Sequence, residues 1–441
     1  MNRRHIPIAL ARRLGYKMQP PNYVDLGSLR SLYSTQEPRG GWGTSRVNVR
    51  DDTTMQREVQ EILQEAARQQ ASDVHIIIDD NGVQVRVRVN GQLAPFRSGA
   101  ATINWRPEHG RQICMTAYAM AAEGGTADSN YDPFNFQAGR IMNSLPQGVQ
   151  AVRLQFNPVG YSGRHLVMRL LYASHAAGHS LRDLGFSEHQ VAVLDDAGAD
   201  PTGIVIISGP TGSGKTTTLE RMLRKIVKDN PGDSVLSVED PPEYRIPGVI
   251  QLPVSNLRSD EDRGQAYTEA IAAALRSDPD RIMIGEVRTR AAAHHAFEAA
   301  MTGHQVLTTV HANDALSVIP RLRDVGVEEY KLRDPSLVRC LVAQRLIRSL
   351  CPQCRRPVSL TSELIPADLA QRMAVIPQCR TVHIAGPGCP SCIEGYKGRT
   401  VVAEIIRPDQ RLLDLLCVGD RVAAERYWID AMGGQNFIHA A

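Results

Sequence analysis

From about residue 176 onward, short apolar runs alternate with stretches that have helical spacing. The apolar runs are Ile204–Ser208, Val235–Val238, Arg281–Gly285 and Gln305–Val310. Strands of this length separated by helices are typical of a parallel sheet. The pattern therefore predicts an α/β domain built on a parallel-rich sheet.

Upstream, the pattern predicts the start of a smaller α+β domain. A helix is expected from Thr53, because Thr53 and Gln56 fit a capping box ahead of an apolar stripe at helical spacing. Residues 71–78 and 83–89 are expected to form two strands, and the second alternates apolar and polar positions. Residues 80–82, with the sequence Asp-Asn-Gly, join them as a tight turn, so the pair predicts a β-hairpin.

Two later strand-like stretches, around Val152–Phe156 and Leu166–Leu171, complete this smaller domain near Tyr172. Between them and the hairpin, residues 123–136 are rich in Gly, Asp and Asn and are expected to be a loop. Residues 1–52 carry paired prolines and glycines and are expected to be irregular.

Composition narrows the class of protein. The chain has 441 residues, of which 42% are hydrophobic and 22% charged, so it has enough apolar material for more than one core. No apolar run is long enough to span a bilayer, and arginines interrupt the N-terminal apolar residues, so we expect no secretory signal. The net charge of +3 gives no electrostatic argument for nucleic-acid binding.

A complete P-loop pattern stands between the strand Ile204–Ser208 and a helix expected over Thr217–Lys228. Glycines allow backbone N–H groups to close around phosphates, and the helix N-terminus adds positive potential. We expect Lys215 to reach the β- and γ-phosphates and Thr216 to ligate Mg²⁺, so the chain binds a nucleoside triphosphate. The candidate nucleotide-binding residues are Gly209, Pro210, Thr211, Gly212, Ser213, Gly214, Lys215, Thr216 and Thr217.

Three further polar side chains follow strands of the same predicted sheet. Glu243 lies after the second strand, Glu286 after the third and His311 after the fourth. The carboxyl ends of parallel strands meet at one edge of a sheet. We therefore expect all three side chains to face the γ-phosphate, although each alone is more often a surface acid or a structural histidine.

Four of the eight cysteines form two Cys-x-x-Cys pairs, on either side of the segment 355–388. Four thiolates suit a tetrahedral structural zinc site. The alternative is a thioredoxin-like redox pair, but two pairs flanking one excursion favour metal. The candidate zinc ligands are Cys351, Cys354, Cys389 and Cys392. The other cysteines (Cys114, Cys340, Cys379 and Cys417) are expected to be small buried residues.

The order of these motifs resembles the secretion ATPase superfamily of type II secretion, type IV pilus and type IV secretion systems. The P-loop is followed by Glu-Asp-Pro-Pro-Glu at 239–243, a strand ending in Gly-Glu at 285–286, Thr-Gly-His at 302–304 and Ala-Gln-Arg-Leu at 343–346. The likeness extends upstream to Ala-Ser-Asp-Val-His at 71–75 and downstream through the cysteine pairs to about residue 405.

The resemblance implies a RecA-like ATPase domain behind a smaller, PAS-like domain, assembled as a six-subunit ring that hydrolyses ATP. It implies that Glu243 or Glu286 activates the attacking water. Arg140 and Arg153 resemble the family's arginines that neutralise γ-phosphate charge. Position 289 is threonine, where the family commonly has an acid. The expected division is 1–54 N-terminal segment, 55–173 α+β domain, 174–346 ATPase core, 347–400 zinc element and 401–441 helical region.

By the same resemblance, the function is an ATP-driven motor for type IV pilus assembly or type II secretion. The implied partners are an inner-membrane platform protein and cytoplasmic docking proteins, with pilins acted on indirectly and no direct nucleic acid. The implied location is the cytoplasm, at the inner membrane through partners. Two alternatives stay open: a type IV secretion or conjugation ATPase, and a nucleotide-binding scaffold with negligible turnover. The zinc element favours assembly motors, and the motifs do not separate pilus from type II secretion.

Overall fold

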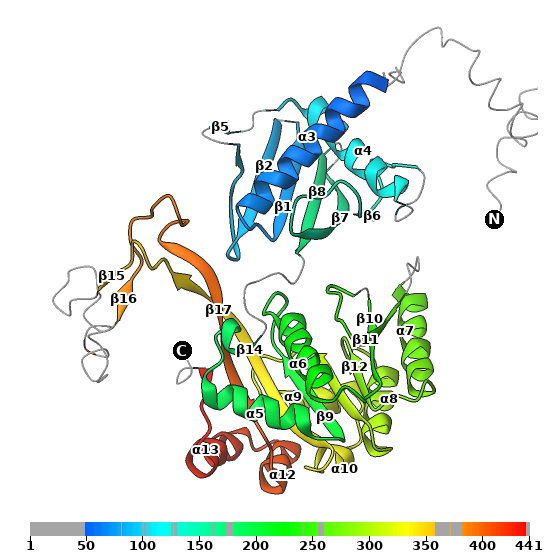
Figure 1. Ribbon diagram of the computed structural model, residues 1–441, viewed down its shortest axis with the longest axis vertical. Coiled ribbons are helices and arrows are strands. Elements are labelled where there is room, and N and C mark those ends of the chain that lie inside the picture. The colour runs from blue at the N-terminus through cyan, green and yellow to red at the C-terminus, as the bar shows by residue number, and fades with distance from the viewer. Residues whose placement is uncertain are drawn as a thin grey trace, which may run out of the picture. The chain divides into compact units, whose positions relative to one another are not determined.

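The computed structural model describes residues 49–80, 82–98, 101–102, 105–124, 127, 130–160, 163–172, 180–240, 242–254, 260–357, 371 and 382–437. It contains two large sheets (Figure 1). The first has one hydrophobic core, and the second has a core on each face. Residues 1–48, which include most of the segment expected to be irregular, and Cys379 lie outside the described residues.

The first sheet has six strands in the order β3-β2-β1-β8-β7-β6. All of its neighbours pair antiparallel. One face of the sheet packs against α3 (Val49–Arg68) and α4 (Pro107–Glu123). The strands are β1 Asp73–Asp79, β2 Gly82–Val89, β3 Gln92–Pro95, β6 Gln137–Ile141, β7 Val149–Val159 and β8 Gly163–Tyr172, beside a small hairpin of β4 Arg97–Ser98 and β5 Ala101–Thr102.

Most of the elements predicted for this region are present. The predicted β1–β2 hairpin forms, and its strands extend far enough that Asp79 pairs with Gly82. The predicted helix start at Thr53 is wrong, because α3 begins at Val49 and Thr53 lies inside the helix. Helix ends are weakly encoded, and Asp51 and Asp52 supply a competing first-turn signal a few residues earlier.

The second sheet has seven strands in the order β11-β10-β12-β13-β9-β14-β17. It is parallel from β11 to β14, and β17 adds antiparallel to β14 at one edge. The predicted α/β fold with a parallel-rich sheet is therefore confirmed. The strands are β9 Gly203–Ser208, β10 Val235–Glu239, β11 Val249–Pro253, β12 Arg281–Ile284, β13 Gln305–Val310, β14 Val338–Leu350 and β17 Tyr396–Ile406.

Helices cover both faces of this sheet. Val205 and Ile207 of β9 pack into a core with α5 and α6, whereas Ile204 and Ile206 of the same strand pack into a core with α8 and the C-terminal helices. Strands buried on both faces are continuously apolar, which is why these runs stood out in the sequence. The helices are η1 Arg182–Leu184, α5 Glu188–Ala199, α6 Lys215–Asp229, α7 Asp260–Leu275, α8 Arg290–Met301, α9 Val318–Val325, α10 Glu329–Leu332, α12 Gln410–Val418 and α13 Arg421–Met432.

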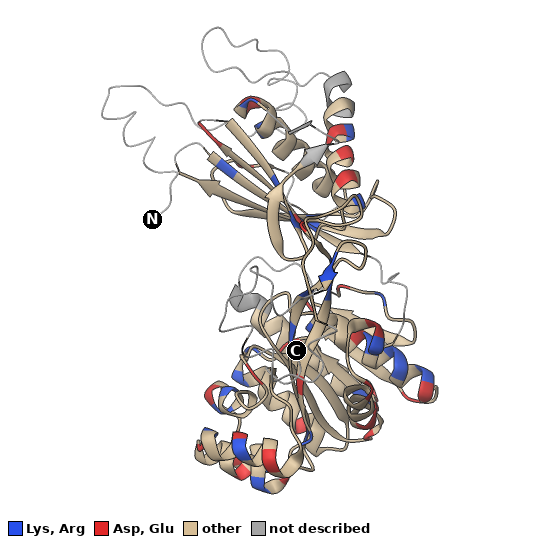
Figure 2. Ribbon diagram, turned by 90° about the vertical axis from the view of Figure 1, so that its left-hand side faces the viewer, with Lys and Arg blue, Asp and Glu red and all other residues tan. Residues whose placement is uncertain are grey.

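Lys and Arg are interspersed with Asp and Glu along the helices, and the strands are largely neutral (Figure 2). None of the helices within the described residues is both long and apolar enough to cross a membrane. Cys114, Cys340 and Cys417 are buried, as expected for small core residues.

Candidate functional site

The P-loop connects the end of β9 to the start of α6 at the carboxyl edge of the parallel sheet. Gly209, Gly212 and Gly214 all have positive φ, at 146°, 78° and 87°. A side chain at Gly209 would also collide with the carbonyl oxygen of Gln344 on β14 and with Ser213. Only glycine relieves both constraints at that position. The loop therefore has the close backbone turn that a phosphate cradle requires.

Lys215 is the first residue of α6, and its ammonium lies over this loop. Its Nζ donates to the carbonyl oxygens of Gly209, at 2.8 Å, and Pro210, at 3.3 Å. Burial lowers the pKa of Lys215, and the negative charges of Glu286 and Glu243 act in the opposite direction. The two carboxylates that the sequence placed after separate strands thus both act on this lysine.

Glu286, two residues beyond β12, is held by a guanidinium and an imidazole. Arg288 lies 2.7 Å from Glu286 Oε2, and His311 Nε2 lies 3.1 Å from Glu286 Oε1. His311 directly follows β13, so this contact joins the ends of neighbouring strands. The structure therefore brings together Lys215, Glu286 and His311, as the order of the strands predicts.

Glu243 is exposed on the short connection between β10 and β11. The adjacent Tyr244 has its hydroxyl 3.2 Å from the hydroxyl of Thr217, in the first turn of α6. Thr217, expected among the nucleotide-binding residues, has in this structure a protein partner on the Glu243 connection.

The threonine at 289 has a local structural role. Its hydroxyl accepts a hydrogen bond from the backbone N–H of Ala292 at 3.2 Å and caps the N-terminus of α8. An N-cap hydroxyl satisfies one of the otherwise unpaired N–H groups of a helix, as a carboxylate would. Thr289 therefore caps α8 in this chain.

Two further side chains support the site: one that the sequence did not single out, and one inside the Ala-Gln-Arg-Leu motif at 343–346. The Tyr267 hydroxyl, on α7, accepts from the backbone N–H of Glu286 at 3.0 Å and donates to the carbonyl of Val238 at 3.3 Å. The amide of Gln344, buried on β14, donates to the Ser213 carbonyl at 2.7 Å. Tyr267 lies in no predicted motif and is far from its partners in the sequence, whereas Gln344 belongs to the predicted Ala-Gln-Arg-Leu motif, and the structure adds its contact with the P-loop.

Arg140 and Arg153 belong to the first sheet, on the neighbouring strands β6 and β7. They lie directly opposite each other in the antiparallel register. Burial lowers the pKa of Arg140, and the positive charge of Arg153 lowers it further. The structure thus pairs the two candidate arginines on one face of that sheet.

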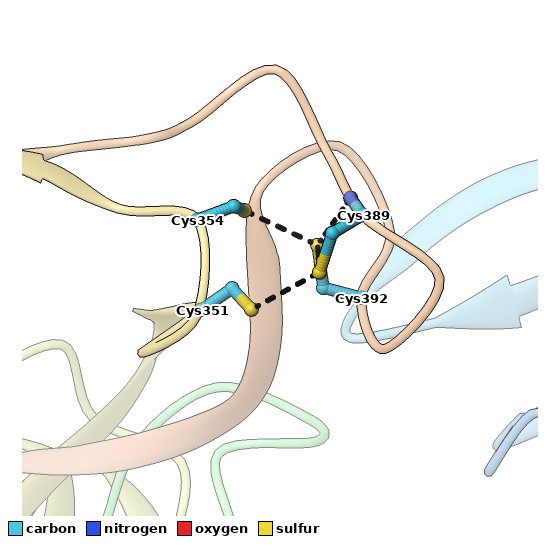
Figure 3. Close-up of side chains that lie close together, drawn as sticks. All are labelled: Cys351, Cys354, Cys389 and Cys392. Carbon is cyan, nitrogen blue, oxygen red and sulfur yellow. Dashed lines mark hydrogen bonds between the residues drawn. The ribbon is translucent and has the colours of Figure 1, made fainter.

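The four candidate zinc ligands form one cluster (Figure 3). Cys351 Sγ lies 3.7 Å from Cys389 Sγ, and Cys354 and Cys389 Sγ each lie 3.6 Å from Cys392 Sγ. Four sulfurs at ~2.3 Å from one tetrahedral ion stand about 3.8 Å apart, whereas a disulfide needs about 2.05 Å. The thiols therefore fit a single metal ion better than two separate redox pairs.

The cluster closes the base of the excursion between the pairs. Cys351 directly follows β14, and its N–H donates to the carbonyl of Gly395, just before β17, at 2.8 Å. Beyond the first pair, β15 (Arg356–Pro357) and β16 (His383–Ile384) form a two-stranded ribbon.

These observations define a P-loop protein with a four-cysteine cluster, and comparison with known proteins places it in a family. A family model described as "Type II/IV secretion system protein" matches residues 48–435. The match spans most of the chain, so the chain belongs to this family, and the predicted resemblance is confirmed.

Among curated proteins, the chain is 35% identical over 381 residues to the type II secretion system protein HxcR of Pseudomonas aeruginosa, covering 85% of this chain and 71% of the relative. It is 34% identical over 370 residues to the type II secretion system ATPase E of Vibrio cholerae, with coverages of 83% and 68%. The type IV pilus assembly ATPase PilB of Thermus thermophilus is 33% identical over 370 residues, with coverages of 84% and 39%.

Solved structures agree on the fold. The ATPase DotB of Legionella pneumophila superposes with a TM-score of 0.55 at 19% identity, covering 91% of this chain and 92% of its own. The pilus retraction motor PilT gives a TM-score of 0.53 at 21% identity, with coverages of 86% and 91%. The RecA-like architecture implied by the resemblance is therefore also confirmed.

Proposed function

We propose that this chain is an ATPase that hydrolyses ATP to ADP and phosphate with Mg²⁺ and couples the reaction to type II secretion or type IV pilus assembly. The observation that carries the proposal is the convergence of Lys215, Glu286 and Glu243 beside a P-loop with three glycines of positive φ. The curated relatives carry the names of secretion-system and pilus-assembly ATPases.

In this proposal, the backbone of residues 209–214 and the Lys215 ammonium hold the phosphates, and Thr216 ligates Mg²⁺, which neutralises phosphate charge. Phosphate oxygens are charged acceptors, so they compete well with the neutral carbonyls that Lys215 contacts in this structure. Glu243 or Glu286 orients the attacking water, and His311 keeps Glu286 in place through their 3.1 Å contact.

We further propose that the chain works as a six-subunit ring at the cytoplasmic face of the inner membrane, docked to a platform protein. Arg140 and Arg153 would then supply positive charge to the γ-phosphate, as arginine fingers do. Their direct pairing across β6 and β7 supports a joint role, because two adjacent arginines present two positive charges from one place.

We also propose that the four cysteines hold one structural Zn²⁺. The 3.6–3.7 Å spacing of the sulfurs supports this assignment, and all four positions of a tetrahedral ion are taken by sulfur. Cys354→Ser is expected to lower bound zinc from one ion per subunit to nearly none, measured by elemental analysis. Unchanged zinc content in this variant would refute the four-cysteine site, and Cys417→Ser provides a control at a cysteine outside the cluster.

The central test is ATP turnover by the purified protein, with the subunit number measured by light scattering in the same preparation. We expect slow, Mg²⁺-dependent hydrolysis by a six-subunit species. Glu286→Gln should keep nucleotide binding and lose about 100-fold in turnover, because a positioned carboxylate contributes about that much to water activation. Binding without any hydrolysis by the wild-type chain would instead support the nucleotide-binding scaffold.

A further inference from the structure

The connection from β10 to β11 carries Glu243 and makes an unusual crossover. The two strands pair in parallel at one edge of the sheet (Figure 1), although parallel neighbours are usually joined through a helix. Residues 242–248 contain no helix or strand, so other contacts must fix their conformation.

Gln251, in the middle of β11, makes three side-chain hydrogen bonds, two of which reach this connection. Its side-chain Nε2 donates to the carbonyl of Tyr244 at 2.8 Å and to Glu239 Oε1 at 2.9 Å, and its Oε1 accepts from the N–H of Ile246 at 3.0 Å. Both N–H groups of the amide are therefore used, and one lone pair is used as well. The contacts to Tyr244 and Ile246 hold the backbone on the C-terminal side of Glu243.

Glu239 anchors Gln251 to the sheet. Its carboxyl is buried at the end of β10 and also accepts from the Ser237 hydroxyl at 2.7 Å. Burial raises the pKa of Glu239, while the hydrogen bonds from Gln251 and Ser237 lower it. Ser237 lies opposite Gln251 in the parallel register, so the three polar side chains form one network across β10 and β11.

Two contacts join the same connection to α6, the helix that follows the P-loop. The Tyr244 hydroxyl lies 3.2 Å from that of Thr217, and Arg224 donates to the carbonyl of Arg245 at 3.2 Å. Thr217 is two residues from Lys215. The connection is thus held from β11 on one side and from the phosphate-binding helix on the other.

We propose that Gln251 and Tyr244 are positioning residues that hold Glu243 toward the nucleotide: Gln251 fixes the backbone of its connection, and Tyr244 fastens that connection to α6 through Thr217. This inference rests on the proposed ATPase function and on Glu243 acting in it. In this proposal neither residue touches the reacting atoms, and both act by fixing the position of the Glu243 carboxylate.

The first test is steady-state ATP hydrolysis by Gln251→Leu and Tyr244→Phe in the full-length chain. A shift of about 1 Å in a catalytic group can cost about 100-fold in rate. We expect kcat to fall about 30-fold in Gln251→Leu and about 5-fold in Tyr244→Phe, with KM for ATP within about twofold, because the phosphate cradle is untouched. Tyr427→Phe, which loses a hydroxyl contact to Asp409 on the C-terminal helices, should keep both constants.

Two further comparisons separate positioning from a structural effect. Adding Gln251→Leu to Glu243→Gln should cause little additional loss of kcat, because two residues that act through one carboxylate are not additive. Likewise, Thr217→Val should reduce the effect of Tyr244→Phe. Equal losses of kcat in the Glu243→Gln background and in the wild type would overturn the proposal.

Hydrogen exchange tests the inference without relying on turnover. In Gln251→Leu the Ile246 amide loses its acceptor, so the peptide 242–249 should exchange faster while peptides from β9 and β13 stay unchanged. Unchanged exchange in that peptide would overturn the proposed role of Gln251 even if the wild-type chain proved inactive. Faster exchange with a wild-type kcat would show that the connection loosens without consequence, which also overturns it.

Discussion

The two ends of the parallel sheet carry the same types of side chain in opposite settings. At the amino end, Arg281 opens β12, and its side chain is only 6% exposed beside Asp233. At the carboxyl end, Arg288 is 74% exposed and pairs with Glu286. Both are arginine–carboxylate pairs, at 2.6 Å and 2.7 Å, so distance does not distinguish them.

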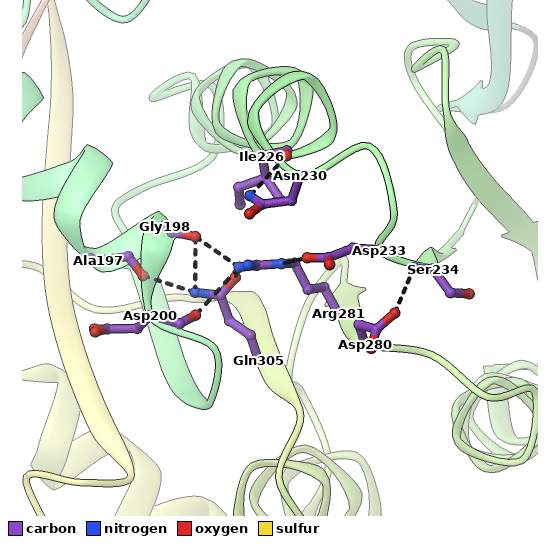
Figure 4. Close-up of polar contacts among 10 residues, drawn as sticks. All are labelled: Ala197, Gly198, Asp200, Ile226, Asn230, Asp233, Ser234, Asp280, Arg281 and Gln305. Atoms are coloured by element: carbon purple, nitrogen blue, oxygen red, sulfur yellow. Dashed lines mark hydrogen bonds and ion pairs between the residues drawn. The ribbon is translucent and has the colours of Figure 1, made fainter.

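The other hydrogen-bond partners of the two arginines distinguish them. Arg281 also donates to the carbonyls of Gly198, at 2.8 Å, and Asp200, at 3.3 Å, and to Gln305 (Figure 4). The guanidinium thereby neutralises the C-terminal end of α5, where the helix dipole is negative. A buried charge with this many partners fixes one arrangement, whereas an exposed pair contributes about 0–1 kcal/mol and can change partners at little cost. The amino end is thus built for stability and the carboxyl end for exchange with a ligand.

The largest expected effect comes from the carboxyl end. Lys215→Ala removes the ammonium that the P-loop presents to phosphate, so we expect ATP turnover to fall at least 1,000-fold, below detection. Among the described residues, the hydrogen bonds of the Lys215 ammonium go to two backbone carbonyls, so the thermal midpoint should change by no more than a few degrees. A parallel assay of turnover and thermal unfolding checks both statements, and wild-type turnover would contradict the assigned site.

The second-largest effect is expected on stability and comes from the amino end of the sheet. Arg281→Leu removes a donor from Asp233 and from the Asp200 carbonyl, and one of two donors from the Gly198 carbonyl, and we expect unfolding to become easier by about 3–5 kcal/mol. Arg288→Leu is the matched control, at the other end of β12, and should change stability by no more than about 0.5 kcal/mol. Urea unfolding measures both variants, and equal losses would show that burial does not separate the two arginines.

The third prediction uses the two ends of β13. Gln305, its first residue, is buried and donates to the carbonyl of Ala197 at 2.8 Å, so Gln305→Leu should cost about 1–3 kcal/mol. His311, which directly follows the strand, is 43% exposed and contacts Glu286. His311→Leu should instead lower kcat about 10-fold with little change in unfolding. ATP turnover and urea unfolding are measured on both variants. Equal losses of kcat and of stability in the two would contradict the assignment of stability to the amino end of the sheet and of activity to its carboxyl end.

The smallest effect is expected at Thr289. Removing the N-cap hydroxyl of α8 in Thr289→Ala should cost about 1 kcal/mol of stability. Thr289→Asp, which restores the residue type common in the family, should unfold like the wild type. A loss in Thr289→Ala larger than that in Gln305→Leu would mean that position 289 does more than cap the helix.

The sequence was sufficient to predict those features that lie within a short stretch of the chain. The P-loop, the buried strands and the cysteine pairs each lie within a few consecutive residues, and the fold predicted from them is confirmed. The β14–β17 pairing joins Leu341 to Ile406, and Arg281 meets Gly198, so neither could be predicted from periodicity. Gln251 was missed for the same reason, because its role depends on where the chain turns after β10.

The four cysteines also affect how this chain can change over evolutionary time. They sit where β14 ends and shortly before β17 begins, so they tie the excursion at its base. A loop closed at its base pays only a small, slowly growing entropic cost for added residues. Insertions and deletions between the two pairs can therefore accumulate without shifting the register of the sheet, which makes this segment a place where related motors can acquire different contacts while the nucleotide site stays the same.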